Sequence, residues 1–273
     1  MKLRFLQWNI RYNSDFLKIA ELITASIDGS ALVQIQEVTR SHFENLKKCL
    51  SPSDSAFSLD FRAPGYHEGK NRALGVATFL FDGIIEKSRI LERSLFPERT
   101  LFVEAQFSDV RIRSLNFHSL TGVGYKHGKA SNFASIADFL AENKLDFFSC
   151  DANEPMVDSI EIGDVKFFDN GDSGRCAALL FGSDRIHALD DVWRRFALSQ
   201  GNHSETPPIS YVINEKVKKR YDFIYSTSQH SPIGVQYLLE DSLLATSDHA
   251  LVIADFEIKS PTEGGQFVRL FHN

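Results

Sequence analysis

Apolar segments of strand length recur along nearly the whole chain, whereas segments with helical spacing are few. Ten segments have the length and composition of β-strands: residues 2–10, 31–38, 74–81, 100–107, 110–119, 145–151, 165–169, 177–183, 220–227 and 249–258. A purely parallel sheet needs a helix between nearly every pair of strands, and this chain has too few. The pattern therefore predicts an α/β protein in which two β-sheets pack face to face and helices flank them.

Two segments place apolar residues three and four positions apart, which is the spacing of a buried helix face. The residues concerned are Phe16, Ile19, Ala20 and Ile23 in the first segment and Phe133, Ile136, Ala137 and Leu140 in the second. Asn13, Ser14 and Asp15 precede the first segment and are N-cap candidates. We therefore expect one helix over residues 16–23 and another over residues 133–140.

The 273 residues contain no internal repeat and no linker rich in Pro, Gly or Ser. With 43% hydrophobic residues, including 23 phenylalanines, the chain can bury a sizeable core, which excludes a disordered protein. We expect a single domain over residues 1–273, of which residues 259–273 form a C-terminal tail.

The formal net charge of −6 argues against a protein that binds nucleic acid by bulk charge alone. A polyanionic substrate stays open, because bound divalent cations reverse the local field. The chain shows no signal peptide, and no segment approaches the roughly 18 uninterrupted apolar residues of a membrane span. Cys49, Cys150 and Cys176 have no metal-binding spacing and are expected to be reduced and mostly buried. We expect a cytoplasmic protein without a membrane partner.

Several predicted strands begin or end at residues that carry out metal or proton chemistry. These residues are Asn9, Glu37, His118, Asp151, Asn153, Asp222, Asp248 and His249. Each has an ordinary explanation by itself: Asn and Asp form turns, a glutamate after a strand is often a solvated charge, and Asp222 could pair with Arg220 or Lys219. Loops at strand ends are also where scaffolds carry active sites, so the recurrence favours a common site.

The residue types in this set fit one kind of chemistry. The oxygen ligands of Glu37, Asn9, Asp151 and Asp248 suit Mg²⁺, and two histidines without cysteine clusters argue against structural zinc. A histidine oriented by a carboxylate can take a proton from water, while a second histidine stabilises the phosphate or protonates the leaving group. A divalent cation neutralises charge on the phosphoryl oxygens. The set therefore predicts hydrolysis of a phosphoester.

Six motifs carry these residues in order: "QWNI", "IQEV", "SLNFHSLTG", "SCDANEP", "KKRYDFIYSTS" and "TSDHALVIADF". Together they resemble the motifs of the endonuclease/exonuclease/phosphatase family, the fold group of deoxyribonuclease I and exonuclease III, over residues 8–256. The resemblance implies a deoxyribonuclease I-like fold, a four-layer α/β/β/α sandwich of two mixed β-sheets. It also implies a hydrolase that depends on Mg²⁺, for which Mn²⁺ can substitute.

The resemblance implies a metal-binding role for three residues. Glu37 would be the principal Mg²⁺ ligand, and Asn9 and Asp248 would lie near the cation or the phosphate. Arg11 stands two residues after Asn9, where the exonuclease III branch carries a carboxylate. A second metal ion at that position is therefore not expected.

The resemblance implies a catalytic role for five further residues. Asp222 would orient His249, the general base that acts on water. Asp151 and Asn153 would position the nucleophile and the scissile phosphate. His118 would place the chain in the histidine-bearing branch of the family, to which deoxyribonuclease I belongs.

Two departures from the family pattern concern the surroundings of these residues. Cys150 replaces the glycine that the family has before the aspartate of its "GDxN" motif. The carboxylate that supports the histidine of deoxyribonuclease I is expected within "YHEGKNRALGV", where Glu68 and Asn71 are both candidates.

The family acts on several phosphoesters, so the fold does not choose the substrate. Basic residues near the motifs are either solvated surface charge or a phosphate-binding rim. They are Lys126, Lys129, Arg194, Arg195, Lys216, Lys218, Lys219 and Arg220. Tyr66, Tyr125 and Trp193 are candidates for base stacking, with core burial as the alternative for Trp193.

Three hypotheses on function follow. The first is a nuclease or related phosphodiesterase that acts on DNA or RNA. The second is a phosphoesterase of the same fold that acts on a small-molecule or lipid phosphate. The third is a binding homologue without activity, against which the intact set of motif residues argues.

Overall fold

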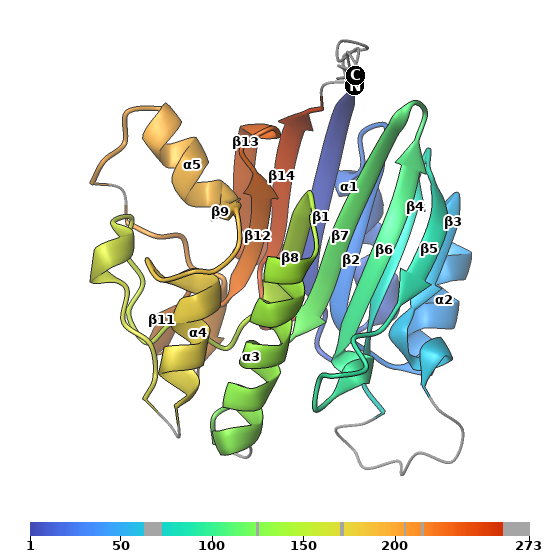
Figure 1. The fold of residues 1–273 in the computed structure, drawn as a ribbon. Helices are drawn as coiled ribbons and strands as arrows, with labels where there is room; N and C mark the ends of the chain where they lie inside the picture. The colour runs from blue at the N-terminus through green and yellow to red at the C-terminus, as the bar shows by residue number, and fades with distance from the viewer. Residues whose placement is uncertain (63–72, 124–125, 170–171, 205, 214–215, 259–273) are drawn as a thin grey trace, which may run out of the picture.

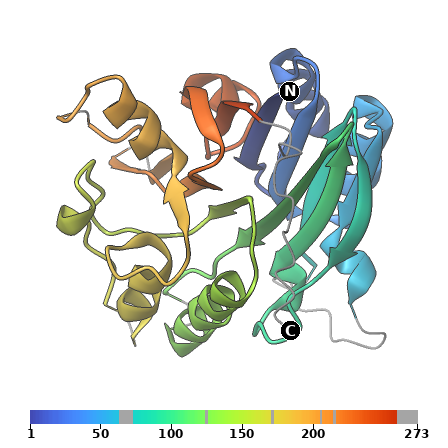
Figure 2. The same ribbon diagram turned by 45° about the horizontal axis from the view of Figure 1, so that its top comes forward.

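The structure is a computed structural model that describes residues 1–62, 73–123, 126–169, 172–204, 206–213 and 216–258. Two six-stranded β-sheets pack face to face, and helices cover the outer face of each sheet (Figure 1). After a turn of 45°, the two groups of helices are seen on opposite sides of the sheets (Figure 2). The predicted four-layer α/β/β/α sandwich is therefore confirmed.

Both sheets are mixed. The first sheet contains, in spatial order, β13 (Ser231–Leu238), β14 (Leu251–Glu257), β1 (Lys2–Asn9), β2 (Ala31–Val38), β4 (Gly75–Phe81) and β3 (Asp54–Phe57). The second contains β5 (Ile84–Arg89), β6 (Thr100–Phe107), β7 (Val110–His118), β8 (Phe147–Asp151), β12 (Asp222–Thr227) and β9 (Leu189–Asp191). A separate hairpin consists of β10 (Tyr211–Ile213) and β11 (Val217–Lys219). Among the strands described, β1 runs parallel to β2 and β7 runs parallel to β8, whereas the other neighbours are antiparallel.

The helices form the outer layers. The first sheet is covered by α1 (Phe16–Ser26) and α2 (Arg40–Leu50), and the second by α3 (Lys126–Glu142) and α4 (Ser173–Phe181). The short α5 (Val192–Ser199) contacts β12 and β13, and α6 (Leu239–Leu244) contacts α1. Short 3₁₀ helices lie at Ser58–Phe61, Pro97–Arg99 and Ile162–Asp164.

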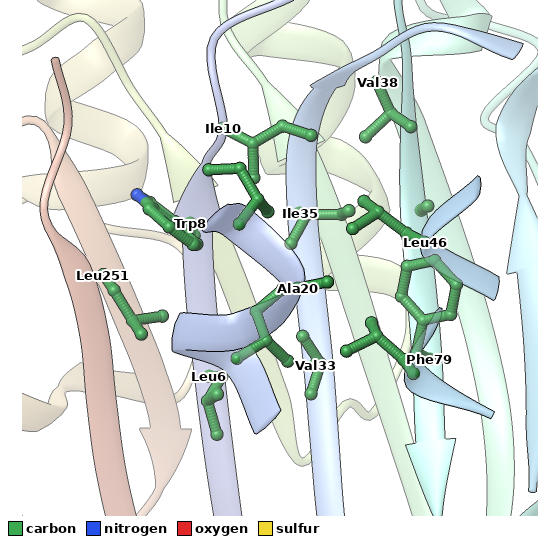
Figure 3. Close-up of a cluster of buried hydrophobic side chains, with 14 of the residues drawn as sticks. Leu6, Trp8, Ile10, Ala20, Val33, Ile35, Val38, Leu46, Phe79 and Leu251 are labelled. Carbon is green, nitrogen blue, oxygen red and sulfur yellow. The ribbon is translucent and has the colours of Figure 1, made fainter. Parts of the chain in front are cut away.

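Helix α1 forms for the reasons that its sequence indicates. The Asp15 side chain accepts a hydrogen bond from Leu17 N at 3.0 Å and caps the helix. Ile19 and Ile23 are buried in the outer core of the first sheet, which is the hydrophobic cluster between this sheet and the helices α1 and α2. Side chains of the sheet, including Trp8, contribute to the same cluster (Figure 3). Burial of each large apolar side chain stabilises the fold by about 1.5–3 kcal/mol.

The layer between the sheets changes from apolar to polar toward one end. On β7, Val110 and Ile112 belong to the core between the sheets, Ser114 and Asn116 follow, and His118 ends the strand. Because side chains alternate along a strand, these residues share one face. The same order recurs in Phe5, Gln7 and Asn9 of β1 and in Phe147, Ser149 and Asp151 of β8. The polar end collects the chemically active side chains.

Two predicted strands are wrong. Residues 177–183 lie mostly in α4, where Ala177, Leu180 and Phe181 are buried at helical spacing. A short apolar run cannot by itself distinguish a buried strand from a buried helix. Residues 165–169 form no strand, and Lys166 makes a single bridge with Val157. The structure also adds elements that were not predicted, including α2, α5, β3, β5 and β13.

The three cysteines are free thiols, but they are not mostly buried as predicted. Cys150 is buried, Cys176 is partly exposed and Cys49 is exposed. None of the described helices is long and apolar enough to cross a membrane.

Candidate active site

Strand register brings residues from both sheets to one end of the sandwich. In the second sheet, His118 lies opposite Asp151 across the parallel pair β7–β8, and Asp222 lies opposite Asp151 across the antiparallel pair β8–β12. From the first sheet, Asn9 Nδ2 donates to Asp151 Oδ2 at 2.9 Å. Residues from three other strands, far apart in the sequence, therefore surround the Asp151 carboxylate.

Glu37 reaches this end through a bulge in β2. Ile35 and Val38 both belong to the outer core of the first sheet, although three positions separate them, and the register against β4 shifts there. Glu37 lies within this bulge and has a φ of 58°, an uncommon conformation for a residue other than glycine. Its Oε2 accepts a hydrogen bond from Tyr12 N at 3.2 Å, and its Oε1 lies 3.9 Å from His118 Nε2.

His249 and Asp222 form a buried hydrogen-bonded pair. His249 Nδ1 lies 2.8 Å from Asp222 Oδ2, to which Ser210 Oγ also donates at 2.7 Å. Burial lowers the pKa of His249, but the negative charges of Asp222 and Asp151 outweigh burial and raise this pKa to about 10. The other ring nitrogen, Nε2, lies 3.8 Å from Asp151 Oδ2. Tyr211 stacks on the imidazole with 4.3 Å between the ring centroids.

Asp151 lies at the centre of the site and is almost fully buried. Its Oδ1 accepts a hydrogen bond from Asn153 N at 3.0 Å, and its Oδ2 lies 3.4 Å from His118 Nε2. Burial raises the pKa of Asp151 to about 7, although the charge of His249 and the amide of Asn9 act to lower it. Burial and neighbouring carboxylates make the ionised form of Asp151 unfavourable, and a positive charge bound beside it would stabilise that form.

His118 is a neutral hydrogen-bond donor. Arg99 Nη1 lies 3.3 Å from His118 Nδ1. A guanidinium group only donates, so Nδ1 accepts and the ring proton resides on Nε2, which faces Asp151 and Glu37. Burial and the positive charges of Arg99 and His249 hold the pKa of His118 well below its usual value.

Arg11 and Asp248 lie at the open edge of the site. Arg11 Nε is 3.8 Å from Asp248 Oδ2, and both side chains are partly exposed. Arg11 N donates to Asn9 Oδ1 at 3.0 Å, which leaves the Asn9 amide nitrogen directed at Asp151. Asn153 is anchored by its Nδ2, which donates to Ser119 O at 3.2 Å.

These side chains line a cleft with a volume of about 370 Å³. Six of the eight predicted site residues line the cleft: Glu37, His118, Asp151, Asn153, Asp248 and His249. Asn9 supports Asp151 from β1, and Asp222 lies behind His249. Arg99 and Tyr211 also line the cleft and were missed. Tyr211 belongs to "SYVINEKVKKRYDFIY", a family-like stretch, but Arg99 ends the short 3₁₀ helix Pro97–Arg99, which carries no motif signal. Two larger hollows, of about 550 and 630 Å³, lie along β5 and α3 and contain none of the predicted residues.

The cleft offers oxygen ligands for a divalent cation. Asp151, Asp222 and His249 have ligand atoms within 4.8 Å of one another. Asp222, however, already accepts three hydrogen bonds, so this pair is better suited to proton transfer than to metal binding. The carboxylates of Glu37, Asp151 and Asp248 are the described groups that fit Mg²⁺ best, because it prefers hard oxygen donors.

Four of the eight basic residues in the predicted rim have donors that are used inside the fold. Lys129, Arg194 and Arg220 are buried and paired with carboxylates. Arg195 donates to the backbone carbonyls of residues 227 and 230. A phosphate-binding role for these four residues is therefore wrong, since their donors are already used inside the fold. Trp193 is buried beneath Arg220, which confirms the core alternative and excludes base stacking.

Lys216 and Lys218 are exposed on the hairpin of β10 and β11, and Lys219 Nζ donates to Met156 O. Several predicted residues lie outside the described part of the chain: Tyr66, Glu68, Asn71, Tyr125 and the side chain of Lys126.

No protein-family model matches the sequence, and no curated protein sequence matches it either. Solved structures do match. A D. rerio TDP2 structure complexed with single strand DNA product has a TM-score of 0.62 and 14% identity, over 94% of this chain and 99% of that chain. The human Nocturnin catalytic domain with bound sulfate anion has a TM-score of 0.64 and 15% identity, over 94% and 95%. An endonuclease/exonuclease/phosphatase from Bacteroides vulgatus has a TM-score of 0.62 and 15% identity, over 95% and 100%.

The chain has the endonuclease/exonuclease/phosphatase fold. The fold that the six motifs predicted is thereby confirmed over nearly the whole chain. At 14–15% identity the likeness concerns the fold, so the activity has to be argued from the side chains of the site.

Proposed function

We propose that this endonuclease/exonuclease/phosphatase-fold protein is a Mg²⁺-dependent phosphodiester hydrolase that cleaves DNA or RNA, with Mn²⁺ able to substitute. The observation that carries the proposal is the buried Asp222–His249 pair, whose free Nε2 faces Asp151 across 3.8 Å. An imidazole oriented by a carboxylate in a cleft is suited to take a proton from water. The likeness to a TDP2 structure with a single strand DNA product supports nucleic acid as the substrate.

In this proposal His249 is the general base. Nε2 takes a proton from the attacking water, while Nδ1 keeps its own proton and donates it in a hydrogen bond to Asp222. The carboxylate of Asp222 stabilises the imidazolium that forms. A neutral imidazole is needed first, although the surrounding carboxylates raise the pKa of His249 to about 10. A Mg²⁺ ion bound by Glu37, Asp151 and Asp248 would neutralise phosphoryl charge and offset the carboxylate field on His249.

The remaining residues position the phosphate. The Nε2 proton of His118 is available to a phosphoryl oxygen, because Arg99 occupies the other ring nitrogen. Asn153 is held by Asp151 and by Ser119 O, so its backbone is fixed at the cleft wall. Asn9 holds the Asp151 carboxylate from the opposite sheet.

A phosphoesterase that acts on a small-molecule or lipid phosphate is the second candidate. It is favoured by the inward orientation of Lys129, Arg194 and Arg220, because a long polyanion is normally held by several exposed cations. The small cleft volume also suits a compact phosphoester.

Cleavage assays separate the two candidates. Supercoiled plasmid, single-stranded DNA and RNA oligonucleotides, and a panel of small phosphoesters are each incubated with Mg²⁺ and with EDTA. We expect cleavage of at least one polymer with Mg²⁺, none with EDTA, and none by a His249→Ala variant purified in parallel. Intact polymers together with phosphate release from small esters would refute the nuclease proposal and support the second candidate.

A further inference from the structure

The polar layer between the sheets contains a chain of three buried amides that ends at Asp222. Gln7 of β1, Gln36 of β2 and Asn116 of β7 are fully buried. Gln7 lies on the inner face of β1, between apolar Phe5 and the site residue Asn9. None of the three amides is among the predicted site residues.

Backbone carbonyls determine which way each amide points. Asn116 Nδ2 donates to Ile35 O at 3.1 Å and Ala77 O at 2.9 Å, so its Oδ1 must be the acceptor. Gln36 Nε2 donates to that oxygen at 2.8 Å. Gln36 Oε1 is consequently left to accept from Gln7 Nε2, also at 2.8 Å.

The last amide of the chain donates to the carboxylate that orients His249. Gln7 Nε2 lies 3.0 Å from Asp222 Oδ1. Ser210 and His249 occupy Asp222 Oδ2, so both carboxylate oxygens are held and the group cannot rotate. A flipped Gln7 would direct Oε1 at the negative carboxylate, which the anchored chain prevents.

Stability alone does not account for Gln7 at this position. Its Oε1 is buried without a hydrogen-bond partner among the described residues, which costs free energy that leucine would not cost. Farther along the same face of β1, Phe5 fills the equivalent position between the sheets. The contact that a leucine could not make is the hydrogen bond to Asp222.

We infer that Gln7, Gln36 and Asn116 are positioning residues that fix the Asp222 carboxylate, and through it the ring of His249. This inference rests on the proposed function for its catalytic meaning, but the hydrogen bond itself can be tested without any substrate. Supporting residues of this kind commonly change activity by about ten- to a hundredfold when removed.

A neighbouring buried glutamine supplies a matched control. Gln34 of β2 is also fully buried between the sheets, and its Oε1 accepts from Ser114 Oγ at 3.3 Å and Ser149 Oγ at 2.8 Å. None of its described contacts reaches Asp222. Gln7→Leu and Gln34→Leu therefore remove the same amide from the same layer, but only the first breaks the connection to the site.

The first measurement is the proton NMR signal of the His249–Asp222 hydrogen bond in the full chain, without substrate or metal. A His249→Ala spectrum assigns the signal. We expect Gln7→Leu to shift or broaden it and Gln34→Leu to leave it unchanged. If Gln7→Leu fails to fold by circular dichroism, Gln36→Leu replaces it, because it removes the acceptor that holds the Gln7 amide, and the same shift is expected.

The second measurement is steady-state hydrolysis of bis(4-nitrophenyl) phosphate with Mg²⁺. We expect Gln7→Leu to lower kcat about ten- to a hundredfold with KM changed less than about twofold, and Gln34→Leu to retain both. An unchanged NMR signal in Gln7→Leu, or equal loss of kcat in both variants, would overturn the inference. A wild-type protein that hydrolyses nothing refutes the proposed function instead, while the NMR signal still decides whether Gln7 holds the pair.

Discussion

The substitution Arg220→Met tests whether the basic segment before β12 serves the core or the substrate. Arg220 and Arg194 pair with Asp158 and Asp191, and the four side chains are at most 9% exposed. Two positive and two negative charges give this cluster a formal charge of zero. The pKa of Asp191 is raised by burial but lowered more strongly by the two guanidinium groups, so the carboxylate stays ionised.

Arg220→Met leaves one buried negative charge without compensation. Breaking a buried ion pair by removing one partner costs about 3–5 kcal/mol. The guanidinium group also stacks over Trp193 and Phe223, with 4.5 Å to each ring centroid, and loss of such contacts costs about 0.5–2 kcal/mol. Because the methionine stem retains some packing, we expect a loss of about 4 kcal/mol in the free energy of unfolding, out of a total of about 5–15 kcal/mol.

Urea unfolding followed by far-UV circular dichroism measures this loss without relying on Trp193 fluorescence. The double variant Arg220→Met/Asp158→Asn restores the formal charge of zero, so it should be more stable than Arg220→Met alone by about 1–2 kcal/mol. Folded Arg220→Met should bind a labelled oligonucleotide as tightly as the wild type. A loss below about 1 kcal/mol, or weakened oligonucleotide binding with unchanged stability, would refute the assignment of Arg220 to the core.

Further substitutions test the catalytic pair, a buried histidine and a second buried ion pair. His249→Ala and Glu37→Ala should each lower phosphodiester turnover by about 10²–10⁴-fold while circular dichroism shows that the fold is retained; near wild-type rates for His249→Ala would contradict its role as general base. Burial lowers the pKa of His187 to about 4, below the usual 6.5, because the charged ring loses its hydration inside the fold. Between pH 6.5 and 4 the unfolded chain therefore binds a proton at His187 that the folded protein does not bind. The free energy of unfolding should fall by up to about 3 kcal/mol as the pH falls through this range. Urea midpoints measured over a pH series should show this fall in the wild type, and His187→Gln should flatten it. Lys129→Met leaves Glu154 buried without its cation and should cost about 3–5 kcal/mol in urea unfolding, part of which Lys129→Met/Glu154→Gln should recover; no recovery would show that the lost charge is not the cause.

The sheet strands next to the site could largely be predicted because their signals are local. β1 and β2 are apolar runs with polar residues near their C-terminal ends, and their observed bounds are close to the expected ones. Residues 177–183 failed because an apolar run of that length fits a strand or a buried helix equally well. The bulge that turns Glu37 toward the cleft depends on pairing with β4, so no signal within β2 revealed it.

Some contacts between the site residues could be predicted from the sequence and others could not. That Asp222 and His249 belong to one site could be expected from the motifs. Ser210 and Gln7 as neighbours of Asp222, and Arg99 as the neighbour of His118, could not. Gln7 and Asp222 are 215 positions apart, and their contact depends on how one sheet packs on the other.

Local patterns in the chain were sufficient to predict the fold class, most central strands and the set of polar residues at the strand ends, because side-chain alternation and strand-end polarity are properties of short segments. Which charges are available to a substrate depends instead on how distant segments pack. Lys129 and Arg220 resemble Lys216 in the sequence, yet the first two are buried against carboxylates and the third is exposed. A buried cation is stable only beside a carboxylate that distant segments bring to it, and that pairing is set by packing rather than by local sequence.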